Sequence, residues 1–280
     1  MSRPAVTTRA GEYRRTEQTL TIDGLRLKVS FAGPAGEVPL VLISGIGAPL
    51  ELWDPFRKAL GMETVAVDAP GVGGSDTMRF PRTMWGIAGL VNKLLDKMGY
   101  GVVDVLGLSW GGGVAQHLAL RRRDRVRKLV LASTGFGLWS IPGDIRAVGQ
   151  LLTPARYFSQ DNFLRVAPAM YGGETRRHPE LLASQAAVRS SHRPSAVGYA
   201  HQLAAAWTWV ALPFLPFIRC ETLVLSGDDD PIVHVATARI MAAALPHGHL
   251  HIAHDGGHLY MVDQADDAAR VVGDFLATKR

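Results

Sequence analysis

Residues 103–111 read Val-Asp-Val-Leu-Gly-Leu-Ser-Trp-Gly, and this stretch decides the fold because an apolar run ends there in a G-x-S-x-G pattern. The run Val103–Leu108 has the length and composition of a buried strand, and the residues after the pattern have helical periodicity. A serine between such a strand and such a helix sits on a strained turn, where the residues two before and two after it pass close together. Gly107 and Gly111 leave room for that approach, because glycine has no side chain. We therefore interpret Ser109 as a candidate nucleophile.

Strand-like and helical stretches alternate on both sides of this turn. The helical stretches are long enough for crossover connections, which predicts parallel strands in a sheet with helices on both faces. A hairpin precedes them, because two strand-like runs within residues 18–33 flank an Asp-Gly pair. Further strands are expected at 38–44, 64–67, 128–132, 222–225 and 249–253, and helices at 50–60, 83–97, 111–121, 235–244 and 263–278.

The alternation lapses between Ser133 and Cys220, where the sequence is helical and rich in loops and has no convincing buried strand. A chain of 280 residues can form one large α/β unit with an excursion. We therefore expect an α/β fold with a mostly parallel central sheet and a helical insertion after its sixth strand. The expected organisation is a flexible amino-terminal arm over residues 1–17, a core of residues 18–134 and 219–280, and the insertion over residues 135–218.

Composition and charge exclude several classes of protein. Hydrophobic residues make up 47% of the chain, which excludes intrinsic disorder and a collagen-like fibre. The net charge of +5 is modest, so no nucleic acid is required as a partner. The single cysteine, Cys220, allows no intramolecular disulfide and favours a reducing compartment, and we expect a cytoplasmic protein. The longest apolar run, Leu203–Ile218, is too short for a membrane span and contains two prolines, so no transmembrane segment is predicted.

A serine hydroxyl becomes a good nucleophile when a base takes its proton and an acceptor orients that base. In this architecture a carboxylate and then a histidine are expected downstream of the serine. Both occur just past predicted strands, as the run Asp228-Asp229-Asp230 and as His258. Loops at the carboxyl ends of parallel strands share one edge of the sheet, so these groups can meet Ser109. The spacing does not separate the three aspartates.

The oxyanion of a tetrahedral intermediate needs hydrogen-bond donors. One is expected from the backbone N–H of the residue after the nucleophile, Trp110, and the other from the loop after an earlier strand. Residues 44–48 (Ser-Gly-Ile-Gly-Ala) form such a loop, and the N–H of Ile46 is the candidate donor. A plain turn is the alternative interpretation of this loop.

Two other chemistries are weaker alternatives. Five histidines within residues 247–258 suggest a metal site, but no cysteine accompanies them and no HExxH helix occurs. The glycines of residues 70–75 suggest a dinucleotide site, but Asp76 stands where the last glycine of G-x-G-x-x-G would be. We predict neither a metal nor an organic cofactor.

These motifs together resemble those of the α/β-hydrolase superfamily. More narrowly, they resemble the intracellular depolymerases of medium-chain-length poly(3-hydroxyalkanoates), which are storage polyesters of 3-hydroxy fatty acids. The resemblance covers about residues 19–276, and Ser-Trp-Gly-Gly together with Tyr-Gly-Gly is its more discriminating part. The motifs are residues 45–48 and 50–52 (Gly-Ile-Gly-Ala, Leu-Glu-Leu), 70–75 (Pro-Gly-Val-Gly-Gly-Ser), 108–112 (Leu-Ser-Trp-Gly-Gly), 171–173 (Tyr-Gly-Gly), 227–232 (Gly-Asp-Asp-Asp-Pro-Ile) and 257–259 (Gly-His-Leu).

The resemblance implies that Asp230 is the acid, because it stands three residues after the glycine that ends its strand, and that His258 is the base. It also implies that the insertion is a helical cap over the active site. Ser44 departs from the pattern, because the superfamily often has His at this position and the depolymerases have Asn. The apolar run at 203–218 forms cap core, and its aromatic residues are also candidates to line an acyl channel or to contact a storage-granule surface. These candidate substrate-binding residues are Trp207, Trp209, Phe214 and Phe217.

The sequence thus predicts a serine esterase with a hydrophobic ester or polyester substrate, most narrowly a depolymerase that releases 3-hydroxy fatty acids. A small-molecule carboxylesterase or a carbon–carbon bond hydrolase of the same fold is the alternative, because the same three side chains serve each of them. A non-catalytic binding module is a further alternative. The complete set of Ser109, Asp230 and His258 argues against it.

Overall fold

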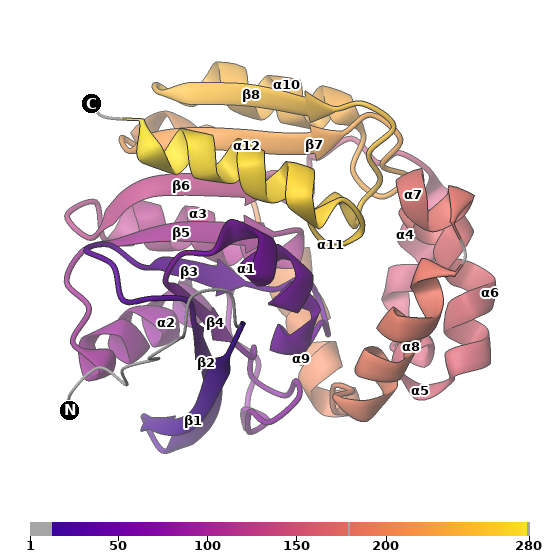
Figure 1. Ribbon diagram of the computed structural model, residues 1–280, viewed down its shortest axis with the longest axis horizontal. Coiled ribbons are helices and arrows are strands. Elements are labelled where there is room, and N and C mark those ends of the chain that lie inside the picture. The colour runs from indigo at the N-terminus through magenta and orange to yellow at the C-terminus, as the bar shows by residue number, and fades with distance from the viewer. Residues whose placement is uncertain (1–12, 179, 279–280) are drawn as a thin grey trace.

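The computed structural model describes residues 13–178 and 180–278. These residues form an eight-stranded sheet in the order β1-β2-β4-β3-β5-β6-β7-β8 (Figure 1). β2 pairs antiparallel with β1 and β4, and the other neighbours pair in parallel. The mostly parallel sheet predicted from the sequence is thereby confirmed. The strands are β1 (Arg15–Ile22), β2 (Leu25–Ala32), β3 (Leu40–Ile43), β4 (Thr64–Val67), β5 (Val103–Leu108), β6 (Val126–Ala132), β7 (Glu221–Gly227) and β8 (Gly248–Ala253).

Helices cover both faces of the sheet because successive side chains of a strand point to opposite sides. In β3, Val41 and Ile43 belong to one buried cluster, whereas Leu40 and Leu42 belong to the other. The first cluster includes residues of α2 (Met84–Met98), α3 (Trp110–Arg121) and α10 (Val235–Ala244), and the second includes residues of η1 (Leu50–Trp53), α1 (Asp54–Leu60), α11 (Tyr260–Asp263) and α12 (Ala265–Ala277).

Between β6 and β7 every element of the described residues is a helix, and this segment follows the sixth strand as predicted. Figure 1 shows α4 to α8 grouped on the side of the sheet toward which the parallel strands run. The segment therefore lies over the edge where the loops after β3, β5, β7 and β8 emerge. Its elements are α4 (Ile145–Gly149), η2 (Gln150–Leu152), α5 (Ala155–Phe158), α6 (Gln160–Tyr171), α7 (Gly173–Arg177), α8 (Leu181–Ser191), α9 (Ala196–Trp207) and η3 (Leu212–Phe217).

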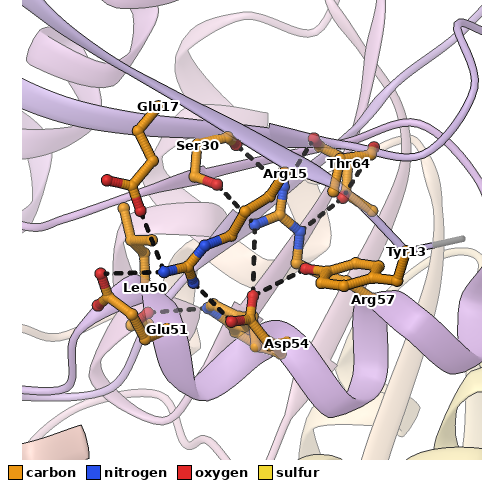
Figure 2. Close-up of polar contacts among 12 residues, drawn as sticks. Tyr13, Arg15, Glu17, Ser30, Leu50, Glu51, Asp54, Arg57 and Thr64 are labelled. Atoms are coloured by element: carbon orange, nitrogen blue, oxygen red, sulfur yellow. Dashed lines mark hydrogen bonds and ion pairs between the residues drawn. The ribbon is translucent and has the colours of Figure 1, made fainter. Parts of the chain in front are cut away.

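Polar contacts join the first of the described residues to α1 (Figure 2). The hydroxyl of Tyr13 donates to Asp54 (2.8 Å), and Arg15 pairs with the same carboxylate (2.5 Å). Arg57 of α1 is buried and donates to side-chain and backbone oxygens of β2 and β4. Of the arm expected over residues 1–17, residues 1–12 lie outside the described residues. β1 begins at Arg15, ahead of the expected start at residue 18.

Candidate active site

The turn between β5 and α3 has a strained backbone. Ser109 adopts φ 53° and ψ −117°, which is an uncommon conformation for a residue with a side chain. A Cβ on Gly107 would lie 2.4 Å from the carbonyl oxygen of Gly111, and one on Gly111 would lie 2.1 Å from that of Ile43. Both positions therefore require glycine. The turn holds the serine hydroxyl at the carboxyl edge of the sheet.

Ser109, His258 and Asp230 form a continuous hydrogen-bonded chain. His258 Nε2 lies 3.0 Å from Ser109 Oγ, and His258 Nδ1 lies 2.8 Å from Asp230 Oδ2. Oδ1 of Asp230 also accepts from the backbone N–H groups of Ile232 (2.8 Å) and Val233 (3.0 Å). A carboxylate at Nδ1 keeps the imidazole proton there and leaves Nε2 as an acceptor. The arrangement can therefore take the proton of the serine hydroxyl.

The three neighbouring aspartates have different surroundings. Asp230 is buried against His258. Asp229 is half-buried and accepts from the backbone N–H of Gly173 (2.7 Å) in the helical insertion. Asp228 is exposed beside other polar side chains of the surface. Within this run only Asp230 contacts the imidazole, a choice that the spacing of the sequence left open.

The loop after β3 lies beside the serine, because a Cβ on Gly45 would lie 3.5 Å from that of Ser109. The backbone N–H groups of Ile46 and Trp110 make no hydrogen bond to another residue of the described chain. The carbonyl of Ile46 accepts from the hydroxyl of Tyr157 (2.7 Å) in the insertion. The carbonyl of Ile46 thus holds the loop in place, and the N–H of Ile46 is left without a partner in the described chain and can donate to an oxyanion.

Ser44 has a local partner at this loop. Its Oγ accepts from the indole N–H of Trp53 in η1 (2.8 Å), and both side chains are buried. This hydrogen bond ties the start of the loop to the helix that follows it.

The Tyr-Gly-Gly motif joins the insertion to the loop that carries the histidine. The carbonyl of Tyr171 accepts from the backbone N–H of His258 (2.7 Å), and the two rings stack at 6.2 Å and 14°. Gly172 has φ 64°, and a Cβ there would lie 2.1 Å from the carbonyl oxygen of Asp229. Gly173 also has a positive φ of 53°. The two glycines let the insertion approach the loops that carry Asp230 and His258 closely.

An apolar cavity of about 420 Å³ opens beside Ser109. Its walls come from the loop after β6, from α9 and from the segment before η3. Of the four aromatic candidates, Trp207 and Trp209 line this cavity. Phe214 and Phe217 are not among its lining residues, and each is about 51% exposed.

A second, smaller cavity of about 40 Å³ lies on the histidine side of Ser109 and is lined by both Ser109 and His258. Two buried arginines of the insertion, Arg156 and Arg189, also line it. Burial raises the pKa of the Tyr171 phenol, but the charges of Arg189 and Arg156 outweigh this effect, so the pKa lies below its ordinary value. Neither arginine was predicted from the sequence, because an arginine in a helical stretch is usually exposed.

A possible cation site lies apart from these cavities. Ligand atoms of Asp228, His254 and Asp255 lie within 4.8 Å of one another, and all three residues are exposed. Exposed acidic groups commonly gather without binding an ion, and this cluster does not line either cavity. No function is assigned to it.

Among the described residues no helix has the length and apolar character needed to cross a membrane.

Comparison with known proteins identifies the class to which this arrangement belongs. Residues 38–265 match the family described as alpha/beta hydrolase fold. The solved structure of an enol-lactonase from Burkholderia xenovorans LB400 superimposes with a TM-score of 0.79 at 25% identity, covering 93% of this chain and 100% of the other. The chain belongs to the α/β-hydrolase family.

Two bacterial hydrolases are similar to this chain over nearly their full length. A poly(3-hydroxyalkanoate) depolymerase from Ectopseudomonas oleovorans is 39% identical over 267 residues, which are 94% of this chain and 93% of the relative. A 2-hydroxymuconate semialdehyde hydrolase from Pseudomonas sp. strain CF600 is 30% identical and covers 91% of each chain. The family and the similarity to the depolymerase identify the protein as an ester hydrolase.

Proposed function

We propose that the protein is a depolymerase that hydrolyses polyesters of medium-chain-length 3-hydroxy fatty acids. The observation that carries this proposal is the similarity to the depolymerase across 94% of the chain. The apolar cavity beside Ser109 supports it, because about 420 Å³ is within the range of pockets that bury most of a medium-sized organic ligand.

In this proposal Ser109 is the nucleophile. Its Oγ attacks the ester carbonyl carbon while His258 takes the hydroxyl proton, and Asp230 stabilises the imidazolium. The backbone N–H groups of Ile46 and Trp110 bind the oxyanion, each contributing about 2.7–4 kcal/mol. His258 then gives the proton to the leaving alcohol, and a water that it activates releases the acyl group from the serine.

We assign the insertion, residues 135–218, the role of a cap that selects the substrate. Trp207 and Trp209 line the apolar cavity, which would hold the acyl chain. Phe214 and Phe217 are half exposed, and their place on the outside suits contact with a hydrophobic polymer surface rather than with a single acyl chain. The cytoplasmic location expected from the single cysteine stays a prediction.

Two assays test the proposal. Release of 3-hydroxy acids from a latex of poly(3-hydroxyoctanoate) is expected, together with a preference for p-nitrophenyl octanoate over p-nitrophenyl acetate. Both activities, and covalent labelling by a fluorophosphonate, should disappear in Ser109→Ala. A preference for acetate without any polymer turnover would contradict the depolymerase function.

A carbon–carbon bond hydrolase is the second candidate, because the 2-hydroxymuconate semialdehyde hydrolase is 30% identical over most of the chain. The same Ser–His–Asp arrangement would serve both reactions. Turnover of 2-hydroxymuconate semialdehyde, compared with turnover of the latex, separates the two candidates. Faster turnover of the semialdehyde would favour this second function.

A further inference from the structure

Two positive charges are buried in the small cavity beside the serine and the histidine. Arg156 of α5 is 4% exposed and Arg189 of α8 is 2% exposed. Both belong to the insertion, and both line the cavity that Ser109 and His258 also line. Taking a guanidinium out of water is costly unless an anion or several acceptors replace the water.

The partners of Arg156 are backbone carbonyls and tyrosine hydroxyls, and the phenol of Tyr171 is among them. It donates to the hydroxyl of Tyr199 (2.8 Å) and to the carbonyls of Gln150 (3.4 Å), Thr153 (3.2 Å) and Ile46 (3.5 Å). Its Nε atom is buried and has no hydrogen-bond partner. No carboxylate of the described residues pairs with it at ion-pair distance.

Arg189 is in a similar position. It donates to the hydroxyl of Tyr157 (3.1 Å) and lies over the rings of Phe163 and Tyr171, 5.1 Å and 5.4 Å from their centres. Its Nε atom is also buried without a partner. Asp263 of α11 is the carboxylate that interacts with the charge of Arg189. This carboxylate accepts hydrogen bonds from Thr175 and Gln185 of the insertion, and it forms no ion pair with Arg189. No carboxylate of the described residues therefore pairs with either guanidinium, and the phenol of Tyr171, whose pKa both charges lower, lies beside them.

The acyl part and the alcohol part of a cleaved ester would lie in different cavities. In an acyl transfer His258 Nε2 must reach the oxygen of the leaving alcohol in order to protonate it. His258 lines the small cavity and does not line the apolar one. The leaving alcohol thus belongs in the small cavity with the arginines, and the acyl chain belongs in the apolar cavity.

We propose that Arg156 and Arg189 bind the carboxylate of the leaving group, so that the enzyme cleaves the last ester bond at the free carboxyl end of a chain. This inference rests on the proposed function. In a 3-hydroxyacyl chain the terminal unit carries its carboxylate only two carbons away from the ester oxygen, so the carboxylate stays close to the bond that is cleaved. An ester inside a chain would place a neutral carbonyl against the arginines instead.

The step balances with the activity already proposed. Ser109 Oγ forms a bond to the carbonyl carbon of the last ester, and the bond from that carbon to the oxygen of the terminal unit breaks. The proton from the serine passes through His258 to this oxygen. A free 3-hydroxy acid leaves with its carboxylate on the arginines, and water then releases the shortened chain from the serine.

A matched pair of substrates tests the inference. The ester dimer of 3-hydroxyoctanoate with a free carboxylate is compared with the methyl ester of the same dimer. A charge-assisted hydrogen bond predicts that the wild type prefers the free acid in kcat/KM by roughly tenfold to a hundredfold. In Arg156→Gln and Arg189→Gln the preference should fall toward one, whereas Arg189→Lys should retain part of it.

The control variant is Arg146→Gln, which removes an exposed arginine of the same insertion and should leave the preference unchanged. A second readout needs no turnover and no buried arginine variant. In Ser109→Ala, calorimetry should show that 3-hydroxyoctanoate binds at least about tenfold more tightly than methyl 3-hydroxyoctanoate. This measurement decides the matter if the glutamine variants do not fold.

The outcomes separate the inference from the proposed function. Equal rates on the acid and the methyl ester, or equal affinity of their monomers for Ser109→Ala, would overturn the carboxylate site even if the polymer is degraded. A preference that survives both glutamine substitutions would also overturn it. Tight, arginine-dependent binding of 3-hydroxyoctanoate without degradation of the polymer would support the site and refute the depolymerase function.

Discussion

The substitution Asp230→Asn tests the hydrogen-bonded chain most directly. Oδ1 of Asp230 accepts from the backbone N–H groups of Ile232 and Val233, and an amide NH₂ group cannot accept from either. The oxygen of the asparagine must therefore stay on that side, and its NH₂ group must face His258 Nδ1. The imidazole then accepts at Nδ1 and carries its proton on Nε2, so it cannot take the proton of Ser109.

A wrong tautomer of this kind lowers kcat by about 10⁴-fold, which corresponds to about 5 kcal/mol of transition-state stabilisation. We expect that loss for hydrolysis of p-nitrophenyl octanoate, and a matching fall in the rate of fluorophosphonate labelling. The folded structure should persist, because the amide has the same shape as the carboxylate and keeps its two backbone hydrogen bonds. Circular dichroism and thermal unfolding check that it does.

Asp229→Asn is the matched control, because it removes the same charge one residue away. Asp229 accepts from Gly173 and does not contact His258. A half-exposed polar contact of this kind is worth about 1 kcal/mol, so kcat should fall by less than about tenfold. If Asp230→Asn kept more than a tenth of the wild-type kcat, or if both variants lost the same activity, the assignment of the acid would be wrong.

Three further predictions test the junction, the acyl cavity and a buried carboxyl. Gly172→Ala should lower the free energy of unfolding by at least about 2 kcal/mol, because φ of Gly172 is 64° and the new Cβ would lie 2.1 Å from the carbonyl oxygen of Asp229. The control is Gly149→Ala, because a Cβ on Gly149 would have no heavy atom within 4 Å. Equal melting temperatures of the two variants in thermal unfolding would contradict the prediction. Ala206→Leu fills part of the apolar cavity and should reduce kcat/KM for p-nitrophenyl octanoate about tenfold more than for p-nitrophenyl butyrate. The reason is that burial of each methylene contributes about 0.8 kcal/mol. An unchanged dependence of kcat/KM on chain length would place the acyl chain elsewhere. Burial raises the pKa of Asp68 from 3.8 to about 7, so the folded carboxyl keeps a proton that the unfolded one loses, and wild-type stability falls as the pH rises between these values. Asp68→Asn lacks this term, and urea unfolding at pH 5 and pH 8 should show the variant gaining about 2 kcal/mol relative to the wild type; a difference independent of pH would refute the raised pKa.

Most of the fold was predictable because it follows from local patterns. The strand β5 and the helix α10 have the bounds expected from periodicity. Near the two ends the sequence was less informative. The helix expected over 263–278 is α12, which begins at Ala265, and the short helix α11 that precedes it was not predicted.

Much of the candidate site was also predictable, because loops after parallel strands meet at one edge of the sheet. His258 lies within hydrogen-bond distance of both Ser109 and Asp230, although the three residues are far apart in sequence. Spacing alone did not identify the acid among the three adjacent aspartates, because the conformation of the turn after β7 determines which carboxylate points inward. Nothing in the local sequence reports the direction of that turn.

The arginines could not be predicted, because their burial is a property of the assembled insertion. Arg156 and Arg189 lie on separate short helices, and each is buried by aromatic rings from other helices. A pattern of residues along one helix carries no information about rings that arrive from elsewhere. Tyr171 was noted only as part of a motif, and its contact with His258 is likewise formed between distant segments.

The division between core and insertion also has a consequence for how substrate choice is built. Ser109, Asp230 and His258 stand on loops of the sheet, whereas four lining residues of the cavities belong to the insertion, namely Arg156, Arg189, Trp207 and Trp209. Tyr171 connects these two parts, because its carbonyl holds the backbone of His258 and its ring stacks on the imidazole. Under the proposed function the insertion would act on the reaction in two physically distinct ways. Its side chains would bind the two sides of the substrate, and its Tyr-Gly-Gly junction would position His258 as the base, so a displaced insertion would lower kcat even for an ester that touches neither arginine.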